Sequence, residues 1–187
     1  MSDSLPPDTE RLRFRRFVPE DVDFMHSLLS DPEHMRFYPR IFSRDEARAW
    51  LEWQFSLYRE HGFGLWMLEL KDTGEPVGQC GFTIQDVEGD KEVEIGYHIS
   101  KRHWRQGLAY EAAAACRDYA FEVLGLERIV ITTGTDNIPS QGVARKVGMN
   151  YDREYIKVRE GRELRQQLYT LERSSRTRGC QTGTVEV

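Results

Sequence analysis

A strand, a short loop and a long helix follow one another along residues 93–125, and this run limits the possible folds more than any other part of the chain. Apolar and polar positions alternate at its start, as a half-buried strand requires. One side has Val93, Ile95, Tyr97 and Ile99, and the other has Glu94, Gly96 and His98. Residues 112, 116, 119 and 123 then recur at helical spacing before Gly125, a residue suited to a helix end. The β-branched run at 128–133 predicts a buried strand parallel to the first, and therefore an α/β fold.

The loop between this strand and this helix has the features of a phosphate site. Residues 104–109 read WRQGLA, and small residues such as Gly107 and Ala109 let a ligand approach the main chain closely. Free N–H groups and the helix dipole at this point favour an anion. Ordinary helix capping is the alternative for so short a motif. A dinucleotide fingerprint needs more glycines than the chain has here, and the lysine of a P-loop does not follow.

The rest of the chain alternates between strand and helix patterns. Further strands are expected over residues 11–17, 62–70, 76–85, 149–158 and 164–171, with a turn at 87–90. A helix is expected from about Val18 to Asp31, and a second from a capping box at Ser43 and Glu46 to about Glu60. A short fourth helix begins at Asp136 or Asn137, because either residue can cap it and Pro139 suits its first turn.

Composition limits the partners and the compartment. The 187 residues include 26 Lys and Arg against 31 Asp and Glu, and the net charge of −5 disfavours nucleic acid and anionic membranes. Cationic residues gather locally beside the loop, at Lys101, Arg102 and Arg105. The three cysteines have no metal-site or disulfide spacing, so we expect no metal and a reducing compartment. The chain shows neither a membrane-length apolar run nor a signal-peptide pattern at residues 1–10, so the expected location is cytoplasmic.

Two motifs in this order resemble those of the GNAT N-acetyltransferases. The loop and helix start resemble the coenzyme A motif x-x-G-x-A, and EIGY followed by W-x-x-G-L-A-x-E-A is most similar to the RimJ/RimL-type branch. The segment from Asn137 to Met149 resembles the second signature, N-x-x-S-x-x-V-x-x-K-x-G-F, with Met149 in place of Phe. The resemblance implies a mixed, mostly antiparallel sheet of about seven strands with one splayed parallel pair and about four helices. It covers residues 11–172, which leaves a lead-in at 1–10 and a flexible tail at 173–187.

The same resemblance implies where acetyl-coenzyme A binds. Its pyrophosphate would lie on the N–H groups that follow Arg105, namely those of Gln106, Gly107, Leu108, Ala109 and Tyr110. The main chain around His98 and Ile99 would bind the pantetheine amides and the oxyanion, and Asn137 would contact the pantetheine arm. The first two helices and their loop would shape the groove that binds the acceptor, and Phe37, Tyr38 and Trp53 are the candidate residues of this groove. Alternatively, these aromatic residues only cover the sheet.

Acetyl transfer to an amine needs a base, an oxyanion site and a proton donor for the thiolate. Glu94 is the predicted base because it shares a strand face with Gly96 and His98, and Glu92 is the reserve. The tyrosine that serves as acid in many GNAT enzymes is replaced by Ala144, so the resemblance makes Ser140 the candidate acid. With no cysteine in the motif, direct attack in a ternary complex is expected.

The acceptor would be a small amine or a protein N-terminus, and a homodimer is possible. A domain that binds or senses acyl-coenzyme A without catalysis is the alternative function.

Overall fold

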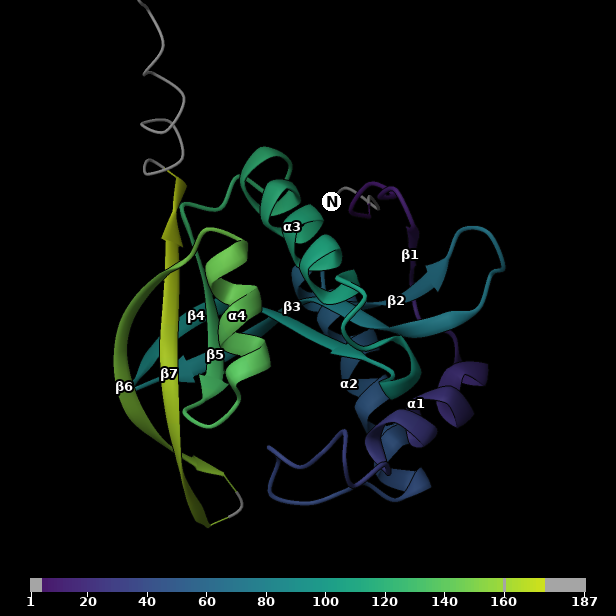
Figure 1. Cartoon of the computed structure of the whole chain (residues 1–187), viewed down its shortest axis with the longest axis horizontal. Helices are drawn as coiled ribbons and strands as arrows, with labels where there is room; N and C mark the ends of the chain where they lie inside the picture. Colours follow the sequence, from purple (N-terminus) through teal and green to yellow (C-terminus); the bar gives the residue numbers. More distant parts are fainter. Residues whose placement is uncertain (1–4, 160, 174–187) are drawn as a thin grey trace, which may run out of the picture.

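Seven strands form one mixed sheet, as predicted, and their order in the sheet is β1-β2-β3-β4-β5-β7-β6 (Figure 1). The computed structural model describes residues 5–159 and 161–173. The strands are β1 (Leu12–Arg15), β2 (Leu65–Leu70), β3 (Pro76–Val87), β4 (Asp90–Ile99), β5 (Arg128–Gly134), β6 (Asn150–Arg159) and β7 (Arg162–Glu172). The helices are α1 (Val22–Leu29), α2 (Arg44–His61), α3 (Leu108–Glu122) and α4 (Ile138–Lys146). Two 3₁₀ turns, Pro19–Asp21 and Lys101–His103, precede α1 and the α3 loop. The predicted tail at 173–187 lies outside the described residues except for Arg173.

Local signals set most element boundaries. Ser43 and Glu46 form the predicted capping box at the start of α2, and Gly62 ends that helix at a left-handed φ of 74°. Asn137 rather than Asp136 caps α4, with Ile138 and Pro139 in its first turn. The predicted turn at 87–90 is shorter in the structure, because Glu88 and Gly89 both adopt positive φ and close a two-residue hairpin between β3 and β4.

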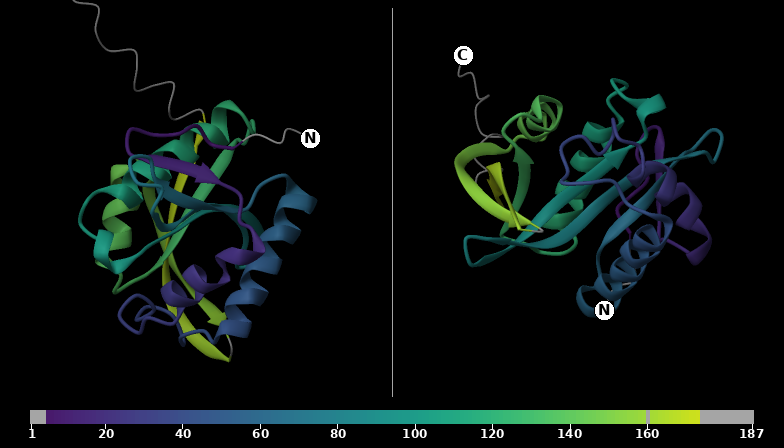
Figure 2. Two further views of the ribbon diagram at one scale, coloured as in Figure 1. Left: turned by 90° about the vertical axis from the view of Figure 1, so that its right-hand side faces the viewer. Right: turned by 90° about the horizontal axis from the view of Figure 1, so that it is seen from below.

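The helices cover the two faces of the sheet in pairs, α1 with α2 and α3 with α4 (Figures 1 and 2). One buried cluster joins α3 to the sheet through Ala112 and Cys116, which pack with Trp66 and Phe82. A second cluster joins α1 and α2 to β2, with Leu51 among its fully buried residues. The first cluster also contains Ile95 and Ile99 of β4 and Ile129 and Ile131 of β5, so it packs α3 against both strands of the parallel pair.

The parallel pair β4 and β5 separates toward its carboxyl end. The two strands share register at Glu94 and Val130, whereas β4 stays paired with β3 along its whole length. Ser100 N donates to Val77 O on β3 at 2.7 Å. Alternate residues of a strand direct their main-chain N–H and C=O groups to the same neighbouring strand, so those of His98 also point toward β3. The main-chain groups of Tyr97 and Ile99 therefore face the gap that β5 leaves.

Candidate active site

A cavity of about 1340 Å³ opens where β4 and β5 separate, and it extends from the start of α3 to the β6–β7 hairpin. Every residue predicted for the site lines this cavity except Gln106. The lining contains seven cationic side chains and three carboxylates: Arg36, Arg40, Lys101, Arg105, Lys146, Lys157 and Arg159, with Glu33, Glu46 and Glu94. The cavity thus has a local positive excess in a chain of net charge −5.

The start of α3, the predicted anion cradle, is an open helix N-terminus. Gly107 is the helix N-cap at φ 81° and has no side-chain cap. The first main-chain bond of the helix runs from Glu111 N to Gly107 O at 3.0 Å, so the N–H groups of Leu108, Ala109 and Tyr110 lack helical acceptors. Arg105 adopts a left-handed φ of 62° and has an exposed side chain beside them. These N–H groups and this cation suit a pyrophosphate.

Arg11 and Glu111, which sequence reasoning missed, hold the cradle in place. The Arg11 Nε donates to Glu111 Oε2 at 2.7 Å, and its Nη1 donates to the carbonyl oxygen of Gln106 at 2.9 Å. Burial raises the pKa of Glu111, but bonds from Thr9 and Arg11 outweigh burial and leave that pKa below its ordinary value. Gln106 thus turns toward Arg11, and its side chain donates to the Arg102 carbonyl at 3.2 Å. Its N–H still belongs to the loop that forms the cradle.

Glu94 lies at the point where the parallel strands separate, and two threonines fix its carboxylate. Thr83 Oγ1 on β3 donates to Oε2 at 3.0 Å. Thr132 on β5 donates to Oε1 from its hydroxyl and, at 3.2 Å, from its N–H. The reserve base Glu92 instead accepts from Arg128 Nε at 3.0 Å and is not part of the cavity lining. Of the two carboxylates, the geometry favours Glu94 as the base.

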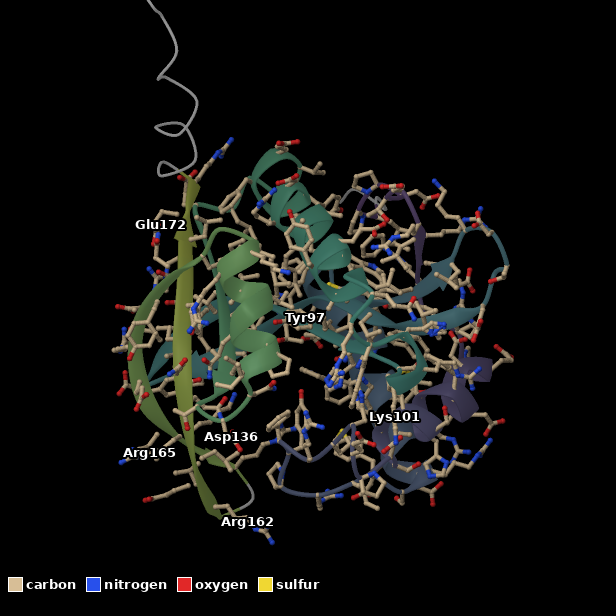
Figure 3. The ribbon with its side chains drawn as sticks, in the orientation of Figure 1. Tyr97, Lys101, Asp136, Arg162, Arg165 and Glu172 are labelled. Carbon is tan, nitrogen blue, oxygen red and sulfur yellow. The ribbon has the colours of Figure 1, made fainter. Side chains whose placement is uncertain are left out.

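Ser140 meets a second hydroxyl inside the cavity. The Tyr97 hydroxyl of β4 lies 2.8 Å from Ser140 Oγ and donates to the Ser140 carbonyl at 3.1 Å, and Figure 3 shows Tyr97 beside α4. Burial raises the pKa of Tyr97, so this phenol stays protonated at neutral pH. Asn137 Oδ1 accepts from Ser140 N at 3.2 Å and caps the helix while it lines the cavity. Ala144 is fully buried in the core.

His98 belongs to a buried chain of aromatic polar groups. Its Nδ1 lies 2.8 Å from His34 Nε2, and its Nε2 lies 3.1 Å from the Tyr38 hydroxyl. Burial lowers the pKa of His98 to about 3 and that of His34 to about 4, so both rings are neutral at pH 7. The His34 partner was not predicted. Both ring nitrogen atoms of His98 are hydrogen-bonded, one to His34 and one to Tyr38. This arrangement suits His98 to positioning Tyr38 more than to acting as the base.

Aromatic side chains from α2 and from the loop at 31–43 form the wall near His98. Trp50 and Trp53 meet edge to face with ring centroids 4.9 Å apart, and Trp50 Nε1 donates to Gln79 Oε1 at 3.3 Å. The Arg36 guanidinium lies 4.6 Å from the ring centroid of Phe37. The predicted acceptor-groove residues Phe37, Tyr38 and Trp53 therefore share one wall of the cavity.

Comparison with known proteins identifies the class of protein to which this fold and cavity belong. A family described as "Acetyltransferase (GNAT) domain" matches residues 11–150, and the chain belongs to this family. The uncharacterized protein YkkB of Bacillus subtilis is 36% identical over 146 residues, which cover 78% of this chain and 85% of that protein. The uncharacterized N-acetyltransferase YoaA of the same organism is 32% identical over 154 residues, covering 80% and 86%.

Solved structures agree with the fold. An acetyltransferase from Agrobacterium tumefaciens superposes with a TM-score of 0.76 at 26% identity, covering 90% of this chain and 95% of that one. RimL, described as a ribosomal L7/L12 α-N-protein acetyltransferase in complex with coenzyme A, gives a TM-score of 0.74 at 18% identity, with coverage of 90% and 98%. The mixed GNAT fold with its seven-stranded sheet is therefore shown.

Within residues 5–159 and 161–173, no group of three or more His, Cys, Asp or Glu side chains is placed to hold a metal ion. Over the same ranges, each helix is too short or too polar to cross a membrane.

Proposed function

We propose that this protein is an acetyl-coenzyme A-dependent N-acetyltransferase that acts on a primary amine by direct attack in a ternary complex. The observation that carries the proposal is the position of Glu94. Its carboxylate is fixed by Thr83 and Thr132 at the separation of β4 and β5, in the same cavity as the open N-terminus of α3. A base and an anion cradle at one gap are what amine acetylation requires.

The donor fits the residues of the cradle. The N–H groups of residues 106–110 and the Arg105 side chain would hold the pyrophosphate. The pantetheine arm would lie along the gap, where Tyr97 and the Ile99 N–H have no partner on β5 and where Asn137 lines the opposite wall. The Ile99 carbonyl accepts from Trp104 Nε1 at 2.7 Å. Acetyl-coenzyme A supplies an activated thioester when bound. The main chain near His98 and Ile99 would also provide the oxyanion site, with the Ile99 N–H turned toward the gap.

The transfer makes one bond and breaks one bond. The amine nitrogen bonds to the thioester carbonyl carbon and the C–S bond breaks, with its electron pair on sulfur. Glu94, directly or through one water, takes the proton that the nitrogen loses. Ser140, backed by the Tyr97 hydroxyl at 2.8 Å, gives a proton to the thiolate. The products are an amide and free coenzyme A, and the two proton transfers balance once solvent restores Glu94 and Ser140.

Glu94→Gln separates catalysis from donor binding. We expect the turnover of acetyl-coenzyme A with a primary amine to fall by about 100-fold or more, because general base catalysis is removed. The dissociation constant of acetyl-coenzyme A, measured by calorimetry, is expected to stay within about twofold because Glu94 is not part of the cradle. Glu163→Gln changes an exposed carboxylate on β7 away from the cavity and serves as the matched control.

Donor binding without turnover in the wild-type protein, over a broad set of amines, would favour the alternative, a non-catalytic acyl-coenzyme A sensor. Full activity of Glu94→Gln would move the role of base to another group. A cytoplasmic location, a homodimer and the domain limits at residues 11–172 stay predictions, and a small amine or a protein N-terminus is the proposed acceptor.

A further inference from the structure

Two cations of β6 line the cavity near Tyr38, on the wall where the acceptor would bind. Lys157 and Arg159 lie two residues apart on β6, so both point to the same face of the sheet. Lys157 Nζ donates to Gln85 Oε1 at 2.6 Å, Gln85 Nε2 donates to Thr83 Oγ1 at 3.0 Å, and Thr83 donates to Glu94. This chain of hydrogen bonds places the two cations on the same side of the sheet as the proposed base.

Neither cation has a carboxylate partner among residues 5–159 and 161–173. The neutral Gln85 is the bonded partner of Lys157, and the guanidinium of Arg159 lies 6.0 Å from the Tyr38 ring centroid. Arg153, on the same strand, pairs instead with Glu88 at 3.0 Å and Asp152 at 2.7 Å.

Burial lowers the pKa of Lys157, and the charges of Glu94 and Asp86 oppose this shift only in part. The lining carboxylates do not neutralise these cations. Glu33 is ion-paired with Lys101, and Glu46 is ion-paired with Arg40. Glu94 is separated from Lys157 by Gln85 and Thr83. A partly desolvated cation without a counter-ion is costly, so this arrangement favours an anion from a ligand.

The hairpin that carries the cations is held against the loop at 31–43. Arg162 Nη1, at the start of β7, donates to the Pro39 carbonyl at 3.0 Å, and Figure 3 shows Arg162 at the tip of the hairpin. The Arg159 guanidinium lies 6.0 Å from the ring centroid of Tyr38, which belongs to the same loop. These contacts keep both cations on the cavity wall beside Tyr38, across the cavity from the cradle at α3 that would hold the donor.

We propose that the acceptor is a primary amine that also carries an anionic group, a carboxylate or a phosphate, with Lys157 and Arg159 binding the anion while Glu94 faces the amine. This inference rests on the proposed acetyltransferase function. Charge-assisted hydrogen bonds to Lys and Arg give the anion its position, and the spacing between the cations and Glu94 then selects the length of the acceptor.

Matched pairs of acceptors test the inference on the wild-type protein. Free coenzyme A is measured with L-amino acids and their α-amides, with phosphoethanolamine and ethanolamine, and with peptide amides that carry Glu or Gln at the second position. We expect the anionic member of at least one pair to have the higher kcat/KM by about ten- to 100-fold, the range for hydrogen bonds to charged groups. The pair that responds identifies whether the anion is a free carboxylate, a phosphate or a peptide side chain.

Variants locate the effect. Arg159→Gln and Lys157→Met should raise KM for the anionic acceptor more than for its neutral partner, so that the ratio of the two kcat/KM values falls about tenfold. Arg153→Gln, on the same strand and away from the cavity, should change neither. Equal use of both members of every pair, or preference for cationic amines such as cadaverine, would overturn the inference and leave the proposed function intact. Transfer to no amine at all would overturn both.

Discussion

Lowering the pH from 7 to 5 is expected to destabilise the protein through the buried pair His34 and His98. Burial lowers the pKa of His98 to about 3 and that of His34 to about 4, with Arg159 also lowering the former and Asp31 partly opposing the latter. His34 Nδ1 is buried without a hydrogen-bond partner among the described residues, so a proton there would have no acceptor. Both rings therefore stay neutral in the folded state, whereas in the unfolded chain they take up protons below a pKa of about 6.5.

The magnitude follows from this difference in proton uptake. Because the unfolded state binds more protons, the free energy of unfolding falls as the pH falls through the unfolded pKa. Between pH 7 and pH 5 the loss is about 2 kcal/mol for His98 and slightly less for His34, or just under about 4 kcal/mol together. Carboxylates with lowered pKa, such as Asp86 and Glu111, lose their contribution only below about pH 4.5. The histidines therefore dominate this pH window.

Urea unfolding followed by tryptophan fluorescence at pH 7, 6 and 5 measures the effect. The double variant His34→Gln, His98→Gln should lose most of the pH dependence, although its stability at pH 7 falls because the buried bonds change. His61→Gln alters an exposed histidine on α2 and should keep the wild-type slope. A wild-type stability that is equal at pH 7 and pH 5, or a double variant with the wild-type slope, would refute the reasoning.

Three further substitutions test separate parts of the site. Glu111→Gln should raise the dissociation constant of acetyl-coenzyme A about fivefold or more by loosening Arg11, as calorimetry would show; an unchanged constant would mean that the loop holds without this ion pair. Tyr97→Phe should reduce kcat about tenfold and stability by about 1 kcal/mol, while wild-type kcat would exclude the hydroxyl from proton transfer. Trp53→Ala should raise KM for the acceptor without weakening donor binding in calorimetry, and the reverse result would place this wall on the donor side.

Local patterns predicted much of the fold, including the helix start at Gly107. The alternation from Val93 to Ile99, the helix start at Gly107 and the capping box at Ser43 depend on neighbours within a few residues, and the structure forms all three elements. The family resemblance, not a local pattern, predicted that the parallel strands separate. The structure confirms this, because β4 and β5 share register only at Glu94 and Val130.

Contacts between distant segments could not be predicted from these patterns. Arg11 and Glu111 lie 100 residues apart, and His34 and His98 lie 64 residues apart, so no periodicity links them. Arg159 lies one residue beyond the strand predicted at 149–158, and its place beside Tyr38 depends on how the hairpin meets the loop at 31–43. The proposal for the acceptor therefore rests on contacts that only the folded chain shows.

Calorimetry with acetyl-coenzyme A on the wild-type protein and on Gly107→Glu tests the central claim most directly. Gly74→Glu is the matched control, because Gly74 has a similar φ of 71°, against 81° at Gly107, and lies in an exposed turn before β3. The account predicts micromolar binding by the wild-type protein and by Gly74→Glu, and a loss of about 100-fold or more in Gly107→Glu, where a carboxylate enters the cradle. No binding by the folded wild-type protein, or equal binding by Gly107→Glu, would contradict it.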